Sequence, residues 1–185
     1  MAKEDTYQTT IIHLVSQDKL RSQALEVVRQ LSLPDCYIGA GFVRNLVWDY
    51  LHSRQSATNL NDVDVVYFDR QEQNPQQYLL YEQQLKQLMP QLNWQVRNQA
   101  LMHVRNGDKP YSSTLDALSY WPEKETAVAI RLSDEKQIEC IAAYGFDSLF
   151  QGHITYNPKR SREVFQQRVD TKGWLEKWPK LEVRY

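Results

Sequence analysis

The spacing of hydrophobic residues along the chain predicts where helices form. In residues 7–33, apolar side chains recur every three or four positions, which is the period of an amphipathic helix. The polar pair Gln17-Asp18 interrupts this pattern, so we expect two helices, with Asp18 as the N-cap of the second. The helical period predicts further helices at residues 42–52, 75–89, 113–122 and 158–179.

Short runs rich in β-branched and aromatic residues predict strands between these helices. They lie at residues 36–39, 62–68, 126–132 and 137–143, the last two forming a hairpin around a Ser-Asp-Glu-Lys turn. Residues 94–105 read as a strand followed by a short second one. A hairpin argues against a purely parallel sheet, so the pattern predicts an α+β fold. We expect a small mixed β-sheet with helices packed against it, an N-terminal helical segment and a C-terminal helix.

The chain has 185 residues, a length that fits a single domain. Within it we expect N-terminal helices in 1–34, a catalytic core in 35–145 and a C-terminal helical segment in 146–185. Hydrophobic residues make up 42% and charged residues 24%, as in soluble globular proteins. The formal net charge of −1 gives no overall field that would favour nucleic acid or an anionic membrane. A local cluster of cations can still bind a small anionic substrate.

Two further features bear on the environment of the protein. No apolar run approaches the ~20 residues that cross a bilayer, and the polar N-terminus has no signal-peptide core. We therefore expect a cytoplasmic protein with no membrane partner. Cys36 and Cys140 each lie in an apolar run, without a Cys/His cluster, which argues against zinc.

A glycine turn connects the first predicted strand to the helix that follows it. Gly39, Ala40 and Gly41 stand at this junction, where glycine allows a tight turn and close approach to a ligand. The N-terminus of the helix offers free N–H groups and partial positive charge to an anion, and Arg44 lies in its first turn. The alternative is a turn that only packs well. The spacing matches neither a Rossmann fingerprint nor a P-loop.

Two aspartates open the next predicted strand. Side chains at i and i+2 of a strand share one face, so Asp62 and Asp64 point the same way. Two carboxylates near a core are costly unless a cation neutralises them, and Mg²⁺ binds carboxylates together with water and phosphate oxygens. The alternative is a turn aspartate followed by a solvent-facing one. The glycine turn, helix and Asp-x-Asp strand together are more specific than either part alone.

This combination resembles the polymerase-β-type nucleotidyltransferase superfamily. The chain is also similar, over roughly residues 36–181, to a bacterial family of nucleotidyltransferase-like proteins with unassigned substrate. The segments that carry this similarity include "GAGFVRNLVWD", "DVDVVYFD" and "IECIAAYGFDSLF". The resemblance implies an NTP substrate and Mg²⁺, or Mn²⁺, held by Asp62 and Asp64. Gly39, Ala40 and Gly41 would contact phosphate.

The resemblance also directs attention to other side chains. The superfamily often has a serine where this chain has Gly41, so the phosphate contact would come from backbone N–H groups, Arg44 or Asn45. It also uses a third carboxylate, for which Glu139 is the candidate, although an exposed edge strand would also explain an acid there. Asn98 and His103 could line the pocket, and His103 could act as a general base or as a hydrogen-bonded structural residue.

These residues favour one function and leave others open. The leading hypothesis is metal-dependent transfer of a nucleoside monophosphate from an NTP to an acceptor, with Asp62, Asp64 and Glu139 as catalytic residues and metal ligands. A small-molecule or protein acceptor fits the charge better than a long nucleic acid. The alternatives are a non-catalytic nucleotide-sensing or partner-binding module and, more weakly, a phosphohydrolase. Basic residues in 158–179 suggest either an anionic partner or a solvated helix face.

Overall fold

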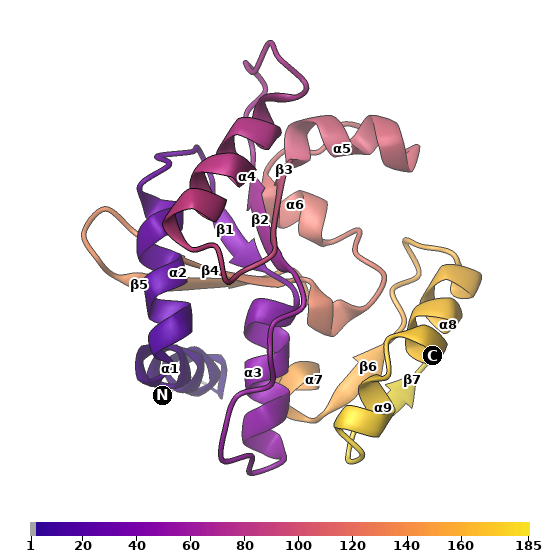
Figure 1. The fold of residues 1–185 in the computed structure, drawn as a ribbon. Coiled ribbons are helices and arrows are strands. Elements are labelled where there is room, and N and C mark those ends of the chain that lie inside the picture. Colours follow the sequence, from indigo (N-terminus) through magenta and orange to yellow (C-terminus); the bar gives the residue numbers. More distant parts are fainter. Residues whose placement is uncertain (1–2) are drawn as a thin grey trace.

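The computed structural model describes residues 3–185 and has the predicted α+β architecture, with a mixed sheet and helices packed against it (Figure 1). Its α-helices are α1 (Lys3–Gln17), α2 (Lys19–Arg29), α3 (Gly41–Leu51), α4 (Gln77–Leu88), α5 (Gln99–Asn106), α6 (Thr114–Leu118), α7 (Asp147–Phe150), α8 (Arg162–Thr171) and α9 (Trp174–Lys177). A 3₁₀ helix, η1, spans Lys124–Thr126. The strands are β1 (Tyr37–Gly39), β2 (Val63–Tyr67), β3 (Trp94–Asn98), β4 (Val128–Leu132), β5 (Ile138–Ala142), β6 (His153–Thr155) and β7 (Glu182–Arg184).

The main sheet has five strands in the order β3-β2-β1-β4-β5. Strand β1 runs antiparallel to both of its neighbours, whereas β2 and β3 are parallel and β4 and β5 form the predicted hairpin. In the β1–β2 register Gly39 stands opposite Asp64. The end of β1 that carries the glycine turn therefore lies beside the start of β2 that carries the aspartates.

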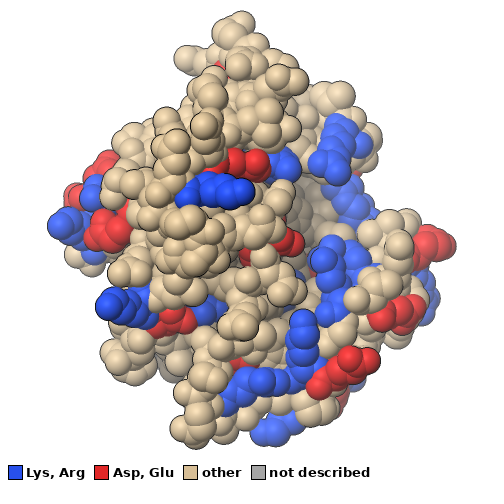
Figure 2. All heavy atoms as spheres, in the orientation of Figure 1, with Lys and Arg blue, Asp and Glu red and all other residues tan. Residues whose placement is uncertain are grey.

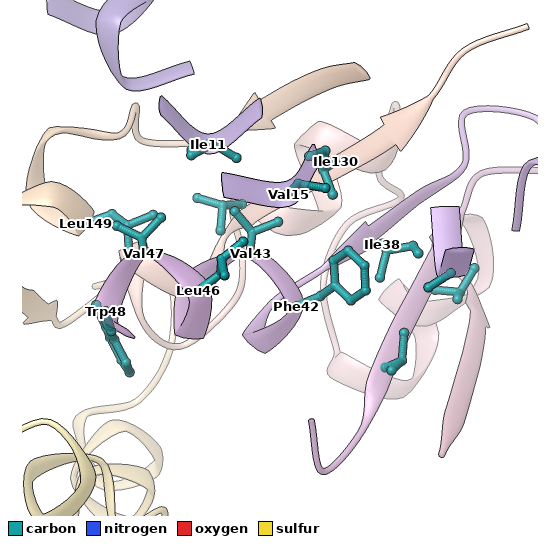
Figure 3. Packing of buried hydrophobic residues seen from close by; sticks show 14 of the residues in the cluster. Ile11, Val15, Ile38, Phe42, Val43, Leu46, Val47, Trp48, Ile130 and Leu149 are labelled. Atoms are coloured by element: carbon teal, nitrogen blue, oxygen red, sulfur yellow. The ribbon is translucent and has the colours of Figure 1, made fainter. Parts of the chain in front are cut away.

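Helix α3 joins the sheet to the helices around it. Figure 3 shows Phe42, Val43 and Val47 of α3 among buried side chains of α1, α7, β1 and β4. Trp48, on another side of α3, packs edge-on against Trp174 of α9, with 5.8 Å between the ring centroids. Burial on these sides fixes the orientation of α3 and hence the direction in which its N-terminus points.

The opposite face of the sheet carries a second, smaller apolar cluster. Its buried members are Tyr37, Val66, Leu118, Ala127 and Ala129, with Trp121 packed against them. Because Tyr37 pairs with Val66 and Gly39 with Asp64, the side chain of Asp64 lies on this same face. The aspartate face is thus covered only partly, which leaves the Asp64 end of β2 accessible.

Two elements differ from the sequence prediction for residues 94–105. A single strand, β3, ends at Asn98, and residues 99–106 form helix α5 instead of a second strand. The side chain of Asn98 accepts a hydrogen bond from Ala100 N and so acts as the N-cap, while Gly107 ends the helix in the left-handed conformation. These capping interactions favour a helix, and residues 99–106 contain only one β-branched residue, Val104, to oppose it.

The predicted helix 158–179 is also divided. Helix α8 ends at Thr171, and Gly173 adopts a φ of 64° before α9 begins. A short parallel pair, β6 and β7, ties this segment to the chain that precedes it. In Figure 1 the C-terminal helices, drawn in yellow, lie across the molecule from the indigo helices α1 and α2. The break at Asp18 is confirmed, because its side chain accepts a hydrogen bond from Arg21 N.

Candidate active site

A cleft of about 350 Å³ opens where the glycine turn, the start of β2 and the C-terminal helices meet. Figure 2 shows Lys and Arg side chains gathered around a hollow beside the C-terminal elements. The polar side chains that line the cleft are Arg44, Asn45, Thr58, Asn59, Asn61, Asp62, Asp64, Thr126, Arg168, Lys172 and Lys177. Residues from four separate parts of the chain, within 40–45, 58–64, 121–126 and 168–178, therefore share one solvent-accessible space.

The backbone of the glycine turn is strained at its middle residue. Ala40 has φ 54° and ψ −126°, a conformation that residues with a side chain rarely adopt. The two glycines have a different feature in common, namely that an added Cβ would make close contacts. A Cβ at Gly39 would lie 3.3 Å from both Trp121 Cη2 and Val128 O, and a Cβ at Gly41 would lie 3.2 Å from Asn45 Nδ2. Strain of this kind persists where the surroundings fix the backbone, commonly at functional sites.

The N-terminus of α3 faces the cleft without a capping side chain. Its N-cap residue is Ala40, which provides no side-chain hydrogen bond. Ala40 and Gly41 both line the cleft, so the first N–H groups of an eleven-residue helix lie beside it. An uncapped helix N-terminus is suited to bind an anion, because its N–H groups and dipole both favour negative charge.

Arg44 is held in place by stacking and hydrogen bonds. Its guanidinium carbon lies 4.8 Å from the ring centre of Trp48 and 4.6 Å from that of Trp174. Nη1 donates to Thr126 Oγ1 at 2.6 Å, and Nη2 donates to Asn45 Oδ1 at 3.1 Å. Burial lowers the pKa of Arg44 to about 10, partly offset by the carboxylate of Glu123. Arg44 therefore remains a fixed cation at neutral pH.

Asp64 is mostly buried, and its charge is only partly compensated. Burial is the main cause that raises the pKa of Asp64, and the nearby charge of Asp62 raises it further. Arg44, Arg168 and Lys172 act in the opposite direction. Asp62 is exposed and accepts a hydrogen bond from Asn93 Nδ2. The two carboxylates thus lie close enough to repel each other.

This pair fits a hard divalent cation. Carboxylate oxygens are the ligands that Mg²⁺ uses in proteins, where it keeps several waters and binds substrate phosphate. Within residues 3–185, no group of three or more His, Cys, Asp and Glu side chains could hold a metal ion. Asp62 and Asp64 would therefore be its protein ligands in this cleft, with phosphate and water in the other positions. A bound cation would also relieve the repulsion that raises the pKa of Asp64.

The structure does not bring Glu139 to the two aspartates. Glu139 lies on β5, which is separated from β2 by β1 and β4, so the two strands are roughly 14 Å apart at ~4.8 Å per strand. One ion cannot bind carboxylates at that separation, given metal–oxygen bonds of roughly 2 Å. Glu139 instead accepts a hydrogen bond of 2.7 Å from Arg131 Nε across the hairpin. This arrangement agrees with the alternative of an edge-strand residue.

Asn98 and His103 also lie away from the cleft. Asn98 pairs with Tyr67 at the far end of β2. Its side-chain oxygen accepts a hydrogen bond from Asp69 N, and its side-chain nitrogen donates one to Asp69 O. His103 Nδ1 is 2.9 Å from Ala100 O within α5. Both residues therefore serve the structure around α5, and neither is among the residues that line the cleft.

The basic residues on the wall opposite the aspartates were not predicted as part of the site. Arg168 lies on the predicted basic helix, but its partner is buried Glu123, at 2.5 Å from Nε to Oε1. Lys172 follows one helical turn later and also lines the cleft, as does Lys177 of α9. Arg168 and Lys172 are four residues apart, a spacing that places two side chains on the same side of a helix. Only the fold shows that this face turns toward Asp64.

Comparison with known proteins identifies the family. The model of the family described as "Nucleotidyltransferase" matches residues 26–183. No curated protein matches the chain. Among solved structures, a protein whose NMR structure is described as revealing a CCA-adding enzyme head domain is similar, with a TM-score of 0.83 and 30% sequence identity. The similarity covers 95% of each chain.

Larger proteins share the fold. A CCA-adding enzyme in complex with CTP gives a TM-score of 0.58 at 16% identity, covering 95% of this chain and 43% of that protein. The apo form of a CCA-adding enzyme gives a TM-score of 0.53 at 16% identity and covers 42% of that protein. The chain thus spans less than half the length of these two enzymes. No helix within residues 3–185 is long and apolar enough to span a bilayer.

Proposed function

Because the chain belongs to the nucleotidyltransferase family, we propose that it transfers a nucleoside monophosphate from an NTP to an acceptor with the help of a divalent cation. Family membership and fold support nucleotide transfer in general. The observation that carries the specific proposal is the register of β1 and β2, which sets Asp64 directly opposite Gly39. The carboxylates and the glycine turn therefore lie side by side, which supports the proposal that they act as one site.

The aspartates would supply the negative half of this site. Asp62 and Asp64 would hold Mg²⁺ or Mn²⁺, which neutralises charge on the reacting phosphate when bound. Asp64 lies on a strand paired on both sides, so its position is fixed before substrate arrives. Such preorganised charge lowers the barrier to phosphoryl transfer more than a mobile group would.

The opposite walls would bind the rest of the triphosphate. The uncapped N-terminus of α3 offers N–H groups, and Arg44 adds a cation that stacking holds in place. Across the cleft, Arg168 and Lys172 act on the charge of Asp64 and are therefore close to the same space. Together they would bind the β- and γ-phosphates and stabilise the pyrophosphate that leaves. Gly41 contributes no hydroxyl, so backbone N–H groups and Asn45 would take that role.

The acceptor remains a prediction. The near-neutral net charge favours a small molecule or a protein over a long nucleic acid. A relative described as a CCA-adding enzyme head domain makes the end of a polynucleotide a further acceptor to test.

A second candidate, a nucleotide-binding module without turnover, has one observation in its favour. Within residues 3–185, no third carboxylate joins Asp62 and Asp64 in a metal-binding group. In the superfamily that this chain resembles, such a third carboxylate can act as the base for the attacking hydroxyl.

Calorimetric titration with each of the four ribonucleoside triphosphates, beginning with CTP and ATP, tests the proposal. We expect binding that requires Mg²⁺ or Mn²⁺ and is lost in Asp64→Asn, because a neutral amide removes a metal ligand. Asp134→Asn, in the exposed β4–β5 turn, is the matched control. Equal binding by the wild type and Asp64→Asn would refute the metal site. Binding without pyrophosphate release, across the three classes of acceptor, would favour the binding module.

A further inference from the structure

We propose that the ring of Trp121 is the surface on which the nucleobase of the NTP stacks. This inference rests on the proposed function and adds the part of the substrate that the phosphate and metal groups leave unassigned. Trp121 lies between α6 and η1, outside both sequence motifs, and lines the cleft that contains Asp64.

The position of Trp121 relative to the aspartates follows from the register of the sheet. Its Cη2 atom lies 3.3 Å from the point where a Cβ of Gly39 would stand. Gly39 pairs with Asp64, so the ring covers the residue directly beside the metal-binding strand. Neighbouring strands are ~4.8 Å apart, which places the ring within about the length of one nucleoside from Asp64. A nucleotide with its α-phosphate at Asp64 could thus reach the ring with its base.

The contact between Trp121 and β1 explains why residue 39 is a glycine. Gly39 does not require a positive φ, since the strained residue of the turn is Ala40. A Cβ at position 39 would instead press against the Trp121 ring and Val128 O. Glycine therefore allows the ring to lie against the end of β1, next to the cleft. This couples the first sequence motif to a residue 82 positions later.

Two other tryptophans line the cleft, but neither has a free ring face. Trp174 is 4% exposed, and the guanidinium groups of Arg44 and Arg168 both lie over its ring. Trp178 is 1% exposed, and its Nε1 donates to Asp49 Oδ1 at 2.8 Å. Trp121 is only partly buried. It is thus the tryptophan of the cleft that retains accessible aromatic surface.

The backbone of Trp121 is fixed from two sides. Its N–H donates to Leu118 O at 2.9 Å, and its carbonyl accepts a hydrogen bond of 2.7 Å from Asn157 Nδ2. Asn157 is itself fully buried. A ring on a rigid support loses little conformational entropy when a base stacks on it. Every base has a π face, so Trp121 would raise affinity for all four nucleotides without choosing among them.

The test compares two ligands and two variants. Dissociation constants for CTP and for inorganic tripolyphosphate are measured with Mg²⁺ on the wild type, Trp121→Phe and Trp121→Leu. Base–aromatic stacking is typically worth an affinity factor of about 5- to 150-fold, so Trp121→Leu should weaken CTP binding by that factor. Binding of tripolyphosphate, which has no base, should change less than about twofold. Trp121→Phe, which retains a ring, should recover most of the CTP affinity.

Each other outcome overturns the inference in a distinguishable way. Unchanged CTP affinity in Trp121→Leu means that the base does not stack on this ring. An equal loss for CTP and tripolyphosphate means that Trp121 only supports the glycine turn at Gly39. If the wild type binds neither ligand, the proposed function fails together with the inference. If it binds both ligands and only the variant comparison fails, the proposed function stands. Thermal unfolding of each variant confirms that it is folded.

Discussion

The two ends of β2 both carry polar groups in a largely buried sheet, but the fold satisfies them differently. At the far end, Tyr67 pairs with Asn98, whose side chain uses its full hydrogen-bonding capacity. Its oxygen accepts from Asp69 N and Ala100 N, and its nitrogen donates to Asp69 O and Glu72 Oε1. This end is complete without a ligand.

At the near end, several features would each be improved by a ligand. Asp64 has a raised pKa because it is buried beside Asp62. The helix that begins at Gly41 has no capping side chain, and Ala40 holds a strained backbone conformation. Natural sequences keep such local costs mainly at functional sites. The comparison teaches that unsatisfied charge, more than the presence of polar residues, separates a site from a structural network.

The largest expected effect on stability is at the satisfied end. Asn98→Ala should lower the free energy of unfolding by about 2–3 kcal/mol, because it removes the cap of α5 and leaves partly buried hydrogen-bond partners, and the buried Ala100 N, without their bonds to the side chain. Chemical denaturation measures this change, with Gln84→Ala on the exposed face of α4 as a control. Nucleotide binding by the folded variant should be unchanged. A loss of binding without a loss of stability would place Asn98 in the site after all.

At the Asp64 end of β2, removal of the polar group should raise the stability of the protein instead of lowering it. The folded protein holds a proton on Asp64 more tightly than the unfolded chain does, since burial raises the pKa above its ordinary value of 3.8. Stability of the metal-free protein should therefore fall as pH rises from 3.8 through the raised pKa of the folded state, and the penalty is complete above that raised pKa. Asp64→Asn should unfold at a higher temperature at pH 7, and the difference should vanish below pH 3.8.

Thermal unfolding across pH in the presence of a chelator measures this effect. Asp134→Asn, in an exposed turn, should show no comparable gain. Added Mg²⁺ should raise the melting temperature of the wild type and leave that of Asp64→Asn unchanged. A variant that is less stable than the wild type at pH 7 would show that Asp64 is satisfied without a ligand.

The smallest expected effect concerns the strained turn. Ala40→Gly should raise stability by about 1 kcal/mol, because relief of a strain of about 1–3 kcal/mol exceeds the added entropy of the unfolded chain. Ala117→Gly, inside α6, should instead lower stability by about 1 kcal/mol. Thermal unfolding of the two variants gives the comparison. Equal losses would mean that the conformation of Ala40 costs nothing.

Local patterns determined much of the fold and the centre of the site. Helical periodicity placed the N-terminal helices and α3, and runs of β-branched and aromatic residues placed β1, β2 and the β4–β5 hairpin. The i, i+2 rule placed the carboxylates of Asp62 and Asp64 on one face of a strand. The pattern misread residues 99–106, where the side chain of Asn98 and the conformation of Gly107 decide the structure.

The tertiary structure alone decided which distant residues complete the site. The sequence made Glu139 a candidate for the third carboxylate, but in the folded sheet two strands lie between it and Asp64. Arg168, Lys172 and Trp121 reach the cleft because the C-terminal segment and the loop after α6 fold back toward β1. Spacing along a chain constrains neighbours within one element. Strand order and the direction of a returning segment depend on the packing of the whole core, which no local pattern encodes.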